Sequence, residues 1–505
     1  MKTFKELRIK RILIPLFIVS FISVAAYGQD PPADSKITNA VDEELMFNTT
    51  TPSYLLDVST IDGIVTLSGS VDNILAKERA EKIAGTVKGV RGVINKITVD
   101  APDIPDEKLR KDVRDALLYD PATDSYELEV IASDSEITLT GTVDSWNEKR
   151  LAGYVAKGVD GVVAVDNNIE INYKTDRPDM EIMEEVEAIL RNDIRVDNAL
   201  IDVSVDGGEV ILSGTVGSLA EKYQAEADAW VAGVSDVNTE GLEVKEWARN
   251  ENMRSDKYVR KTDEEIREAV ENAFLYDPRV NSFNINAEVE NGIVTLTGAV
   301  DSPKARKSAE ADAKNVVGVF SVKNYLKVRP VVIPPDNQLR SDLTNALLRD
   351  PYVEKFEIDI AVDNGVVTLD GAVDTYFEKV QAEDVISRVK GVVAVNNNIT
   401  VMDDYDYYQY DYYGWNTYYP PYYYNYGTGE TYQTDWEIRE DIESQLWWSP
   451  YVNQDEVSVV VLNGEATLTG TVDTEREKLF AEINALEGGA TSVDNNLDVR
   501  YTPSD

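Results

Sequence analysis

The chain has 505 residues, of which 43% are hydrophobic and 28% are charged, proportions typical of a folded globular protein. It contains no cysteine and no histidine, which excludes disulfides, thiolate nucleophiles, imidazole proton relays, and zinc or haem sites built on those ligands. Its formal net charge of −43 repels nucleic acid and anionic lipid headgroups and attracts cations.

The first 28 residues are expected to form a cleavable secretory signal peptide. A basic region precedes an apolar stretch from Ile12 to Ala26, and small residues follow it. About 15 apolar residues fall short of the roughly 20 that a membrane span requires. We therefore predict export to the periplasm, with an uncleaved anchor as the alternative. Because no cysteine follows the segment, a lipoprotein-type anchor is excluded.

One short pattern, Leu-x-Gly-x-Val, occurs six times along the chain, with its glycines at Gly69, Gly141, Gly214, Gly298, Gly371 and Gly470. The basic period is about 72 residues, longer than the roughly 20 to 50 of solenoid repeats. We therefore expect six units that each bury their own core, like beads on a string. Their predicted bounds are 36–100, 106–173, 180–246, 263–329, 336–402 and 435–501, with a charged linker at 247–262 and a Tyr-rich linker at 403–432.

Each repeat begins with a predicted amphipathic helix followed by a predicted hairpin. In repeat 2 the helix carries Leu109, Val113 and Leu117 at helical spacing, and a proline often follows the helix in other repeats too. Alternating apolar residues then predict a strand. Turns are expected at Asp62–Gly63, Gly207–Gly208, Asn291–Gly292, Asn364–Gly365 and Asn463–Gly464. The recurring strand glycine suggests a bulge, or a point where the following helix approaches closely.

A second helix and a last strand complete the predicted repeat. We expect the helix to be capped by an aspartate, namely Asp72, Asp144, Asp301, Asp374 or Asp473, with Gly217 as the exception in repeat 3. It should end at Gly89, Gly158, Gly233, Gly318, Gly391 and Gly488 in the six repeats. The last strand is exemplified by 397–401.

The predicted fold class is α+β, with six tandem two-layer sandwiches. Each has the order α-β-β-α-β and a three-stranded sheet covered on one face by two helices. The second and third strands should be joined by a right-handed crossover if they are parallel. Strand order and the relative orientation of the repeats stay open at this point.

The whole ordered set resembles the BON domain, down to a Gly-Val-x-x-Val-x-Asn-Asn-Ile ending visible at Gly391, Val392, Val395, Asn397, Asn398 and Ile399. The resemblance covers most of the chain after the signal segment. It implies a cell-envelope location, no catalytic activity, and contact with phospholipid or envelope protein. It also implies a role in osmotic stress tolerance or outer-membrane integrity. The chain departs from the family's usual one to three copies.

Two functions are compatible with these features. The first is a non-catalytic envelope protein that contacts phospholipid, with divalent cations as bridges because the acidic chain lacks basic charge for anionic lipid. The alternative is a multivalent protein-interaction or spacer scaffold without direct lipid binding. An enzyme is not expected, since no carboxylate arrangement stands out from the surface charge. No cofactor, catalytic residue, metal site or nucleic-acid partner is predicted.

Aromatic residues near the Tyr-rich linker are the predicted contact sites. Aromatic side chains with polar tips suit membrane headgroups or wet interfaces. The candidates are Trp415, Tyr418, Tyr419, Tyr422, Tyr423, Tyr424, Trp447 and Trp448, the last two at the end of the sixth repeat's first helix. A low-complexity spacer is the alternative interpretation of the linker, and a core position is the alternative for at least one of the two tryptophans.

Overall fold

A computed structural model describes residues 32–47, 55–173, 177–249, 261–281, 283–353, 358–373, 375–401, 434–449 and 451–500. The predicted signal segment and the Tyr-rich linker lie outside these residues. Among the described residues, no helix combines the length and apolarity needed to cross a bilayer.

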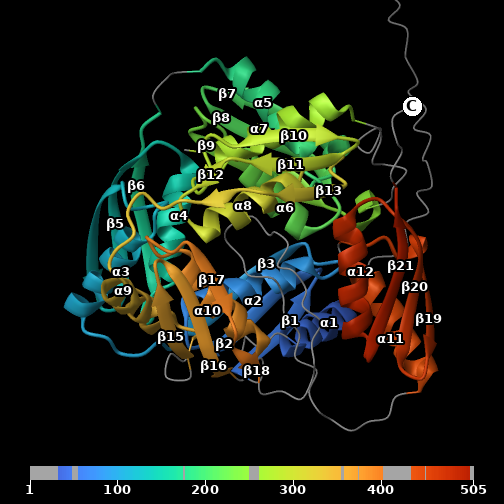
Figure 1. The fold of residues 1–505 in the computed structure, drawn as a ribbon. Coiled ribbons are helices and arrows are strands. Elements are labelled where there is room, and N and C mark those ends of the chain that lie inside the picture. Colours follow the sequence, from blue (N-terminus) through green and yellow to red (C-terminus); the bar gives the residue numbers. More distant parts are fainter. Residues whose placement is uncertain are drawn as a thin grey trace, which may run out of the picture.

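The described chain contains six copies of the unit α-β-β-α-β (Figure 1). Repeat 1 comprises α1 (Asp34–Phe47), β1 (Leu56–Ile61), β2 (Ile64–Val71), α2 (Ile74–Thr86) and β3 (Gly92–Val99). Repeat 2 comprises α3 (Asp106–Tyr119), β4 (Glu127–Ser133), β5 (Glu136–Val143), α4 (Trp146–Lys157) and β6 (Ala164–Ile171). Repeat 3 comprises α5 (Asp179–Asn192), β7 (Ile201–Asp206), β8 (Glu209–Val216), α6 (Leu219–Asp228) and β9 (Asp236–Val244).

The second half of the chain repeats this order. Repeat 4 comprises α7 (Asp263–Tyr276), β10 (Asn286–Glu290), β11 (Ile293–Thr297), β12 (Ala299–Val300), α8 (Pro303–Lys314), β13 (Ser321–Asn324) and β14 (Lys327–Val328). Repeat 5 comprises α9 (Asp336–Arg349), β15 (Ile358–Asp363), β16 (Val366–Val373), α10 (Tyr376–Ser387), β17 (Ala394–Asn397) and β18 (Thr400–Val401). Repeat 6 comprises α11 (Asp435–Trp448), β19 (Val457–Leu462), β20 (Glu465–Val472), α12 (Glu475–Glu487) and β21 (Ser492–Val499).

The sheets have the same topology in every repeat. The two hairpin strands are antiparallel and the last strand runs parallel to the second, so the second strand is central. In repeats 4 and 5 short interruptions split strands that are continuous elsewhere. The predicted α+β class and two-layer unit are confirmed. The strand order, which the sequence left open, follows from the parallel crossover through the second helix.

An aspartate at the start of the first helix fixes the hairpin in each repeat. In repeat 6 the two carboxylate oxygens of Asp435 accept hydrogen bonds from the backbone N–H groups of Asn463 and Gly464, at 2.9 and 2.8 Å. Both turn residues have positive φ, which exposes their N–H groups to the helix. The corresponding aspartates are Asp34, Asp106, Asp179, Asp263 and Asp336.

The predicted caps of the second helix are off by one residue. In each repeat the side chain of the N-cap residue accepts a hydrogen bond from the backbone N–H three residues later, in the first turn of the helix. The N-cap residues are Asn73, Ser145, Ser218, Ser302, Thr375 and Thr474. Five of these directly follow the aspartate that was expected, and Ser218 directly follows Gly217. Gly217 is therefore no exception, because Ser218 caps the helix of repeat 3 as its counterparts do elsewhere.

The predicted glycine stops and the role of the strand glycine also need correction. The second helix ends at Gly158 in repeat 2 and at Gly488 in repeat 6, as predicted, but both glycines have negative φ and the left-handed glycines are Gly161 and Gly489. In the other four repeats the helix already ends at Val87, Ala229, Asn315 or Arg388, before the predicted glycine. The glycine of Leu-x-Gly-x-Val also has positive φ, 140° at Gly470. A Cβ there would overlap the carbonyl oxygen of Glu456 at the start of the hairpin. The close approach comes from the neighbouring strand and not from the following helix.

The repeats are packed together and are not separate beads. Repeats 2, 4, 5 and 6 each have their own apolar core, but repeats 1 and 3 share one continuous core. These two cores merge because α2 packs on α6, where Leu219 and Tyr223 lie over Gly85. The expectation that every repeat buries its own core is therefore wrong for repeats 1 and 3.

Backbone hydrogen bonds also join repeats that are distant in sequence. The N–H of Asp160 in repeat 2 donates to the carbonyl oxygen of Arg349 in repeat 5, at 2.7 Å, and the N–H of Lys390 in repeat 5 donates to that of Tyr119 in repeat 2, at 2.9 Å. These two bonds join equivalent positions in the two repeats, so the pair has approximate two-fold symmetry. A matching bond runs from Val317 in repeat 4 to Asn192 in repeat 3.

The second helices of the repeats meet in the interior, and the sheets lie toward the outside (Figure 1). Helix α2 contacts α6, and α8 contacts α10. An ion pair between Lys157 and Glu78 joins α4 to α2, and the Arg476 guanidinium of α12 donates to the amide oxygen of Asn315 at the end of α8. Polar side chains of the second helices therefore contact one another between repeats, in the interior of the protein.

Candidate functional site

A cavity of about 250 Å³ lies where five of the six repeats meet. Its walls come from α2, α4, α5, α6, α7 and α8, together with Tyr451 of repeat 6. No sequence-neighbouring pair of repeats builds it alone. Polar, aromatic and small apolar side chains of these helices line it together.

One wall of the cavity is basic. Arg79 and Lys82 project from α2 and Arg150 projects from α4. Arg150 stacks on Trp146, with 4.6 Å from the guanidinium carbon to the ring centroid, and Trp146 stacks in turn on Trp230 of repeat 3. Burial lowers the pKa of the Lys82 ammonium group to about 7. The neighbouring Glu78 opposes this shift, whereas Arg150 adds to it.

The acidic wall of the cavity includes Asp193, Asp228 and Asp312, which belong to two equivalent carboxyl pairs. Asp193 and Asp277 directly follow the first helices of repeats 3 and 4, and Asp228 and Asp312 occupy the same position of the two second helices. Burial, reinforced by the neighbouring carboxyl group, raises the pKa of Asp228 and of Asp312 well above the ordinary value. Each pair therefore tends to hold one proton.

Arg195 partly balances the acidic wall. Its guanidinium donates to both carboxylate oxygens of Asp193, and its side chain is 8% exposed. Gln224 of α6 donates to Asp193 and, at 2.7 Å, to Asp228. The remaining carboxyl oxygens of Asp228, Asp277 and Asp312 have no N–H donor among the described residues, and the proton shared within each carboxyl pair accounts for them.

A second polar centre lies between repeats 2, 4 and 5 and has opposite charges in contact. Arg279 donates to both oxygens of Asp120, at 3.0 and 2.8 Å, and both side chains are almost fully buried. Lys304 of α8 contacts Asp384 of α10 at 2.7 Å, and Arg388 contacts the same carboxylate at 3.3 Å. Burial alone would raise the pKa of Asp384, but Lys304 and Arg388 hold it below its usual range.

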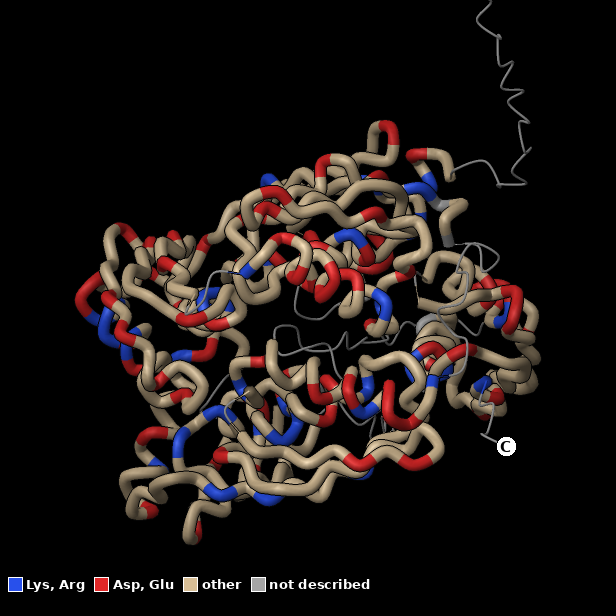
Figure 2. Tube along the Cα trace, turned by 90° about the horizontal axis from the view of Figure 1, so that it is seen from above, with Lys and Arg blue, Asp and Glu red and all other residues tan. Residues whose placement is uncertain are grey.

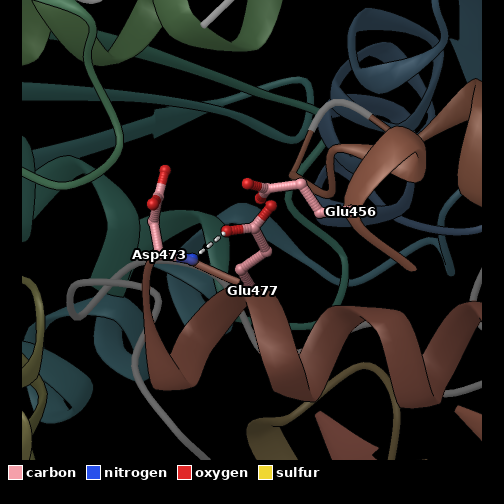
Figure 3. Close-up of side chains that lie close together, drawn as sticks. All are labelled: Glu456, Asp473 and Glu477. Atoms are coloured by element: carbon pink, nitrogen blue, oxygen red, sulfur yellow. Dashed lines mark hydrogen bonds between the residues drawn. The ribbon is translucent and has the colours of Figure 1, made fainter. Parts of the chain in front are cut away.

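Three carboxylates of repeat 6 lie close enough together to hold a metal ion (Figure 3). They belong to Glu456, Asp473 and Glu477. Arg500 forms ion pairs with Glu456 and Asp473, while Glu477 accepts hydrogen bonds from the N–H groups of Asn453 and Asp473, both at 2.9 Å. Glu221 accepts the equivalent bonds from Asp197 and Gly217 in repeat 3. The cluster is thus explained by helix capping and an arginine, without a metal.

The structure describes two of the predicted contact residues. Trp447 and Trp448 are half-buried and their rings pack edge to face. The Nζ of Lys88 in repeat 1 lies 3.6 Å from the Trp447 ring centroid, and Trp448 packs on the core shared by repeats 1 and 3. Both rings join repeat 6 to repeat 1. Trp415, Tyr418, Tyr419, Tyr422, Tyr423 and Tyr424 lie outside the described residues.

Sequence reasoning missed the residues of both polar centres. A signal was present, because an aspartate directly follows the first predicted helix in repeats 2, 3, 4 and 5, at Asp120, Asp193, Asp277 and Asp350. In each case a carboxylate oxygen accepts the N–H two residues later. From the sequence alone, an aspartate that recurs at the end of a helix is interpreted as a residue that caps the helix. Only the folded structure shows that the other oxygen of its carboxyl group is buried between helices.

Comparison with known proteins shows the family. Six segments match the BON domain, at residues 33–101, 105–173, 178–246, 262–330, 335–403 and 434–501. The chain therefore belongs to the BON domain family, as its sequence pattern suggested.

Two individual relatives share two thirds or more of their length with it. Osmotically-inducible protein Y of Escherichia coli (strain K12) is 34% identical over 144 residues, which cover 27% of this chain and 72% of the relative. The outer membrane lipoprotein DolP of Haemophilus influenzae is 33% identical over 138 residues, covering 26% and 71%. Among solved structures, CdsD, a structural protein of the type III secretion system of Chlamydia trachomatis, matches 41% of this chain and 91% of its own, with 16% identity and a TM-score of 0.12.

Proposed function

We propose that this chain is a non-catalytic binding protein of the cell envelope, which contacts phospholipid or other envelope components and supports outer-membrane integrity or tolerance of osmotic stress. The names of its two relatives, one osmotically inducible and one an outer membrane lipoprotein, support this assignment. The predicted signal peptide at residues 1–28 would direct it to the periplasm, peripheral to the outer membrane.

The observation that carries the proposal is the packing of six BON domains into one body. Ion pairs such as Arg279–Asp120 and the shared core of repeats 1 and 3 join the domains through their helices. The outward sheets, and the aromatic residues of 403–432, are then the elements left for contact with a partner. A binding body of this kind needs no catalytic centre.

Charge decides which lipids are suitable. In the view of Figure 2, Lys and Arg are interspersed with Asp and Glu. Attraction to anionic lipid supplies about 1 kcal/mol per Lys or Arg near the surface, and a chain with a net charge of −43 has little of it. Contact with zwitterionic lipid, or with anionic lipid through bridging divalent cations, is therefore expected.

Vesicle co-sedimentation of residues 29–505 tests this proposal. We expect pelleting with phosphatidylethanolamine–phosphatidylcholine vesicles, and pelleting with phosphatidylglycerol vesicles only when millimolar calcium is present. A variant with the six aromatic residues of the linker, Trp415, Tyr418, Tyr419, Tyr422, Tyr423 and Tyr424, replaced by serine should pellet less. Absence of pelleting with every lipid, with and without calcium, would contradict phospholipid contact.

A protein-interaction scaffold is the second candidate, and the open sheet edges favour it. The first and last strands of each described three-stranded sheet are edge strands, which can pair with another chain. On β19, Val460 and Leu462 point outward and are 61% and 67% exposed. An apolar edge strand of this kind fits the addition of a strand from an envelope protein.

Photo-crosslinking in cells tests the scaffold. A benzophenone amino acid at position 460 should give one adduct in stoichiometric yield with a partner protein. The same probe at Arg110, an exposed position on α3, serves as the control and should not. Recovery of the chain as an uncrosslinked monomer from both positions would argue against a protein partner at this edge.

A further inference from the structure

We propose that strand β19 of repeat 6 pairs in antiparallel orientation with β19 of a second copy of this chain, so that two three-stranded sheets join into one continuous sheet. The inference rests on the scaffold candidate above, since it names the partner of the same edge. Hydrogen bonds to β20 occupy one side of β19, and no strand of the described residues pairs with its other side. In Figure 1, β19 lies at the outer margin of the molecule, in agreement with the exposure of Val460 and Leu462.

The absence of charge distinguishes β19 from the first strands of the other five repeats, all of which lie within the described residues. Each of those strands carries at least one exposed acidic side chain on the outer face of its sheet. These are Asp57 in β1, Glu127 and Glu129 in β4, Asp202 and Asp206 in β7, Glu288 and Glu290 in β10, and Asp359 and Asp363 in β15. The outer positions of β19 hold Ser458, Val460 and Leu462. Charged side chains on an edge strand oppose pairing with another chain, and β19 lacks this protection.

The sequence of β19 is suited to pairing with its own copy. Opposed residues of antiparallel strands point to the same face, so the exposed positions of one copy meet the exposed positions of the other. A register centred on Val460 places Val460 opposite itself and Leu462 opposite Ser458 of the second copy. No charge enters this pairing, although each chain has a net charge of −43. The segment Val457–Leu462 is also rich in valine and contains neither proline nor glycine, which favours strand pairing.

The same pairing of the other first strands would bring like charges together. In the equivalent register, β7 would place Asp202 opposite Asp206 of the second copy, and β10 would place Glu288 opposite itself. Like charges directly opposite each other on neighbouring strands are destabilising. Self-association of this acidic chain through a first strand is therefore favoured at β19 over these strands.

The pairing closes at two copies. A contact between identical strands about a two-fold axis uses the same surface on both chains, so no open side of β19 is left. The opposite edge of the sheet is β21, where exposed Asp494 and Asp498 oppose further pairing. Because the contact is short and two acidic chains repel each other, the dimer should be weak and should become stronger as salt screens the repulsion.

Sedimentation equilibrium of the mature chain, residues 29–505, is the direct test. We expect a monomer–dimer equilibrium whose dimer fraction rises with protein concentration. The association constant should rise roughly threefold or more between about 0.1 M and about 0.5 M sodium chloride. A chain that stays monomeric in both salt concentrations, up to its solubility limit, would overturn the proposal. An association that weakens with salt would also overturn it, because the contact would then be ionic.

Matched variants locate the contact. Val460→Lys puts two ammonium groups at the centre of the pairing, so the association should weaken roughly tenfold or more. Ile131→Lys is the control, because Ile131 occupies the equivalent position of β4 in repeat 2 and is 48% exposed. This control should associate as the wild type does. Circular dichroism checks that both variants are folded. Equal association of the wild type and Val460→Lys would overturn β19 as the contact.

Cysteine trapping tests the register, and the chain has no cysteine of its own that would interfere. Under mild oxidation Val460→Cys should form a disulfide-linked dimer, because opposed Cα atoms of antiparallel strands lie about 4.5–5.5 Å apart, within the range that a disulfide spans. A mixture of Ser458→Cys and Leu462→Cys chains should give more mixed dimer than dimer of either kind alone. Ile131→Cys is the control and should stay monomeric. Failure of Val460→Cys to cross-link, with the dimer still present in sedimentation, would overturn the pairing of β19 with itself.

Photo-crosslinking at position 460 separates this inference from the scaffold candidate. An adduct with the mass of two chains supports the second copy. An adduct with a different protein, together with a monomer in sedimentation, would overturn the second copy and leave the scaffold candidate standing. Vesicle pelleting tests phospholipid contact independently of the dimer, so the failures of the two proposals are distinguishable.

Discussion

The aspartate that directly follows the first helix has a partner of opposite charge in repeat 2, but in repeats 3 and 4 its partner is a second carboxyl group of the same repeat. Asp120 in repeat 2 meets Arg279, so a buried negative charge faces a buried positive one. Asp277 in repeat 4 meets Asp312, and Asp193 in repeat 3 meets Asp228, so like groups face each other. The partner, and not the aspartate itself, therefore decides whether this position forms an ion pair or a carboxyl pair.

The oppositely charged centre between repeats 2, 4 and 5 and the two carboxyl pairs respond to pH in opposite directions. Asp384, in the oppositely charged centre, has a lowered pKa, and its contribution to stability is present above the unfolded pKa and lost as pH falls through the folded one. Asp228 and Asp312 have raised pKa values, so their contribution is fully present below the unfolded pKa and is lost as pH rises through the folded one. Burial likewise raises the pKa of Asp350 to about 6, so its contribution to stability is also lost as pH rises.

The largest expected effect comes from breaking the oppositely charged contact with Arg279→Met. Removal of one partner leaves the Asp120 carboxylate buried without its counter-charge, and such a change costs about 3–5 kcal/mol. Urea denaturation at pH 7, followed by tryptophan fluorescence, should show the loss in the first transition. The control Arg340→Met, at an exposed position of α9, should change it little. Equal losses in the two variants would contradict a special role for the ion pair.

A smaller effect is expected from Asp312→Asn, which replaces the proton-holding partner with a neutral side chain. In the wild type each extra proton held by the folded state makes stability fall by up to about 1.4 kcal/mol per pH unit between the unfolded and folded pKa values. In the variant the free energy of unfolding should fall less steeply with rising pH. Urea denaturation at intervals from pH 5 to pH 8.5 measures the slope. An unchanged slope would show that Asp277 and Asp312 do not share a proton.

The smallest effect is expected from Arg500→Ala, which breaks the ion pairs at the surface of repeat 6. The Arg500 side chain is 51% exposed, so water and salt screen its pairs more than that of Arg279, although the Glu456 and Asp473 side chains are only 10% and 5% exposed. The loss of stability should be smaller than that of Arg279→Met and should shrink in 0.5 M sodium chloride. A loss as large as that of Arg279→Met would mean that burial does not account for the difference between the two kinds of pair.

Much of each repeat could be predicted because its determinants are local. The apolar spacing of Leu109, Val113 and Leu117 indicated α3, and Asn364–Gly365 indicated the turn between β15 and β16. Local errors were small and had local causes. Asp473 and Thr474 are both good caps, and only the backbone conformation shows that Thr474 holds the N-cap position. Repeat 2 has no glycine in its hairpin turn, yet Asp134 and Ser135 both adopt positive φ.

The candidate site could not be predicted in the same way. Arg79, Arg150 and Asp312 are separated by up to three repeats in the sequence, and each looks like an ordinary charged residue of a helix. Sequence reasoning turned instead to aromatic residues, because they stand out by composition. Of these, Trp447 and Trp448 join repeat 6 to repeat 1.

The sequence by itself determined the BON unit, its sixfold repetition and the polarity of each helix, because hydrophobic period, turn residues and capping act over a few residues. Only the tertiary structure decided which helix faces met, since the packing of one repeat on another depends on surfaces contributed by residues distant in sequence. That packing placed Asp120 of repeat 2 beside Arg279 of repeat 4, and Asp312 of repeat 4 near Asp193 and Arg195 of repeat 3. Charge and protonation follow from those neighbours, and so does the cavity between the repeats.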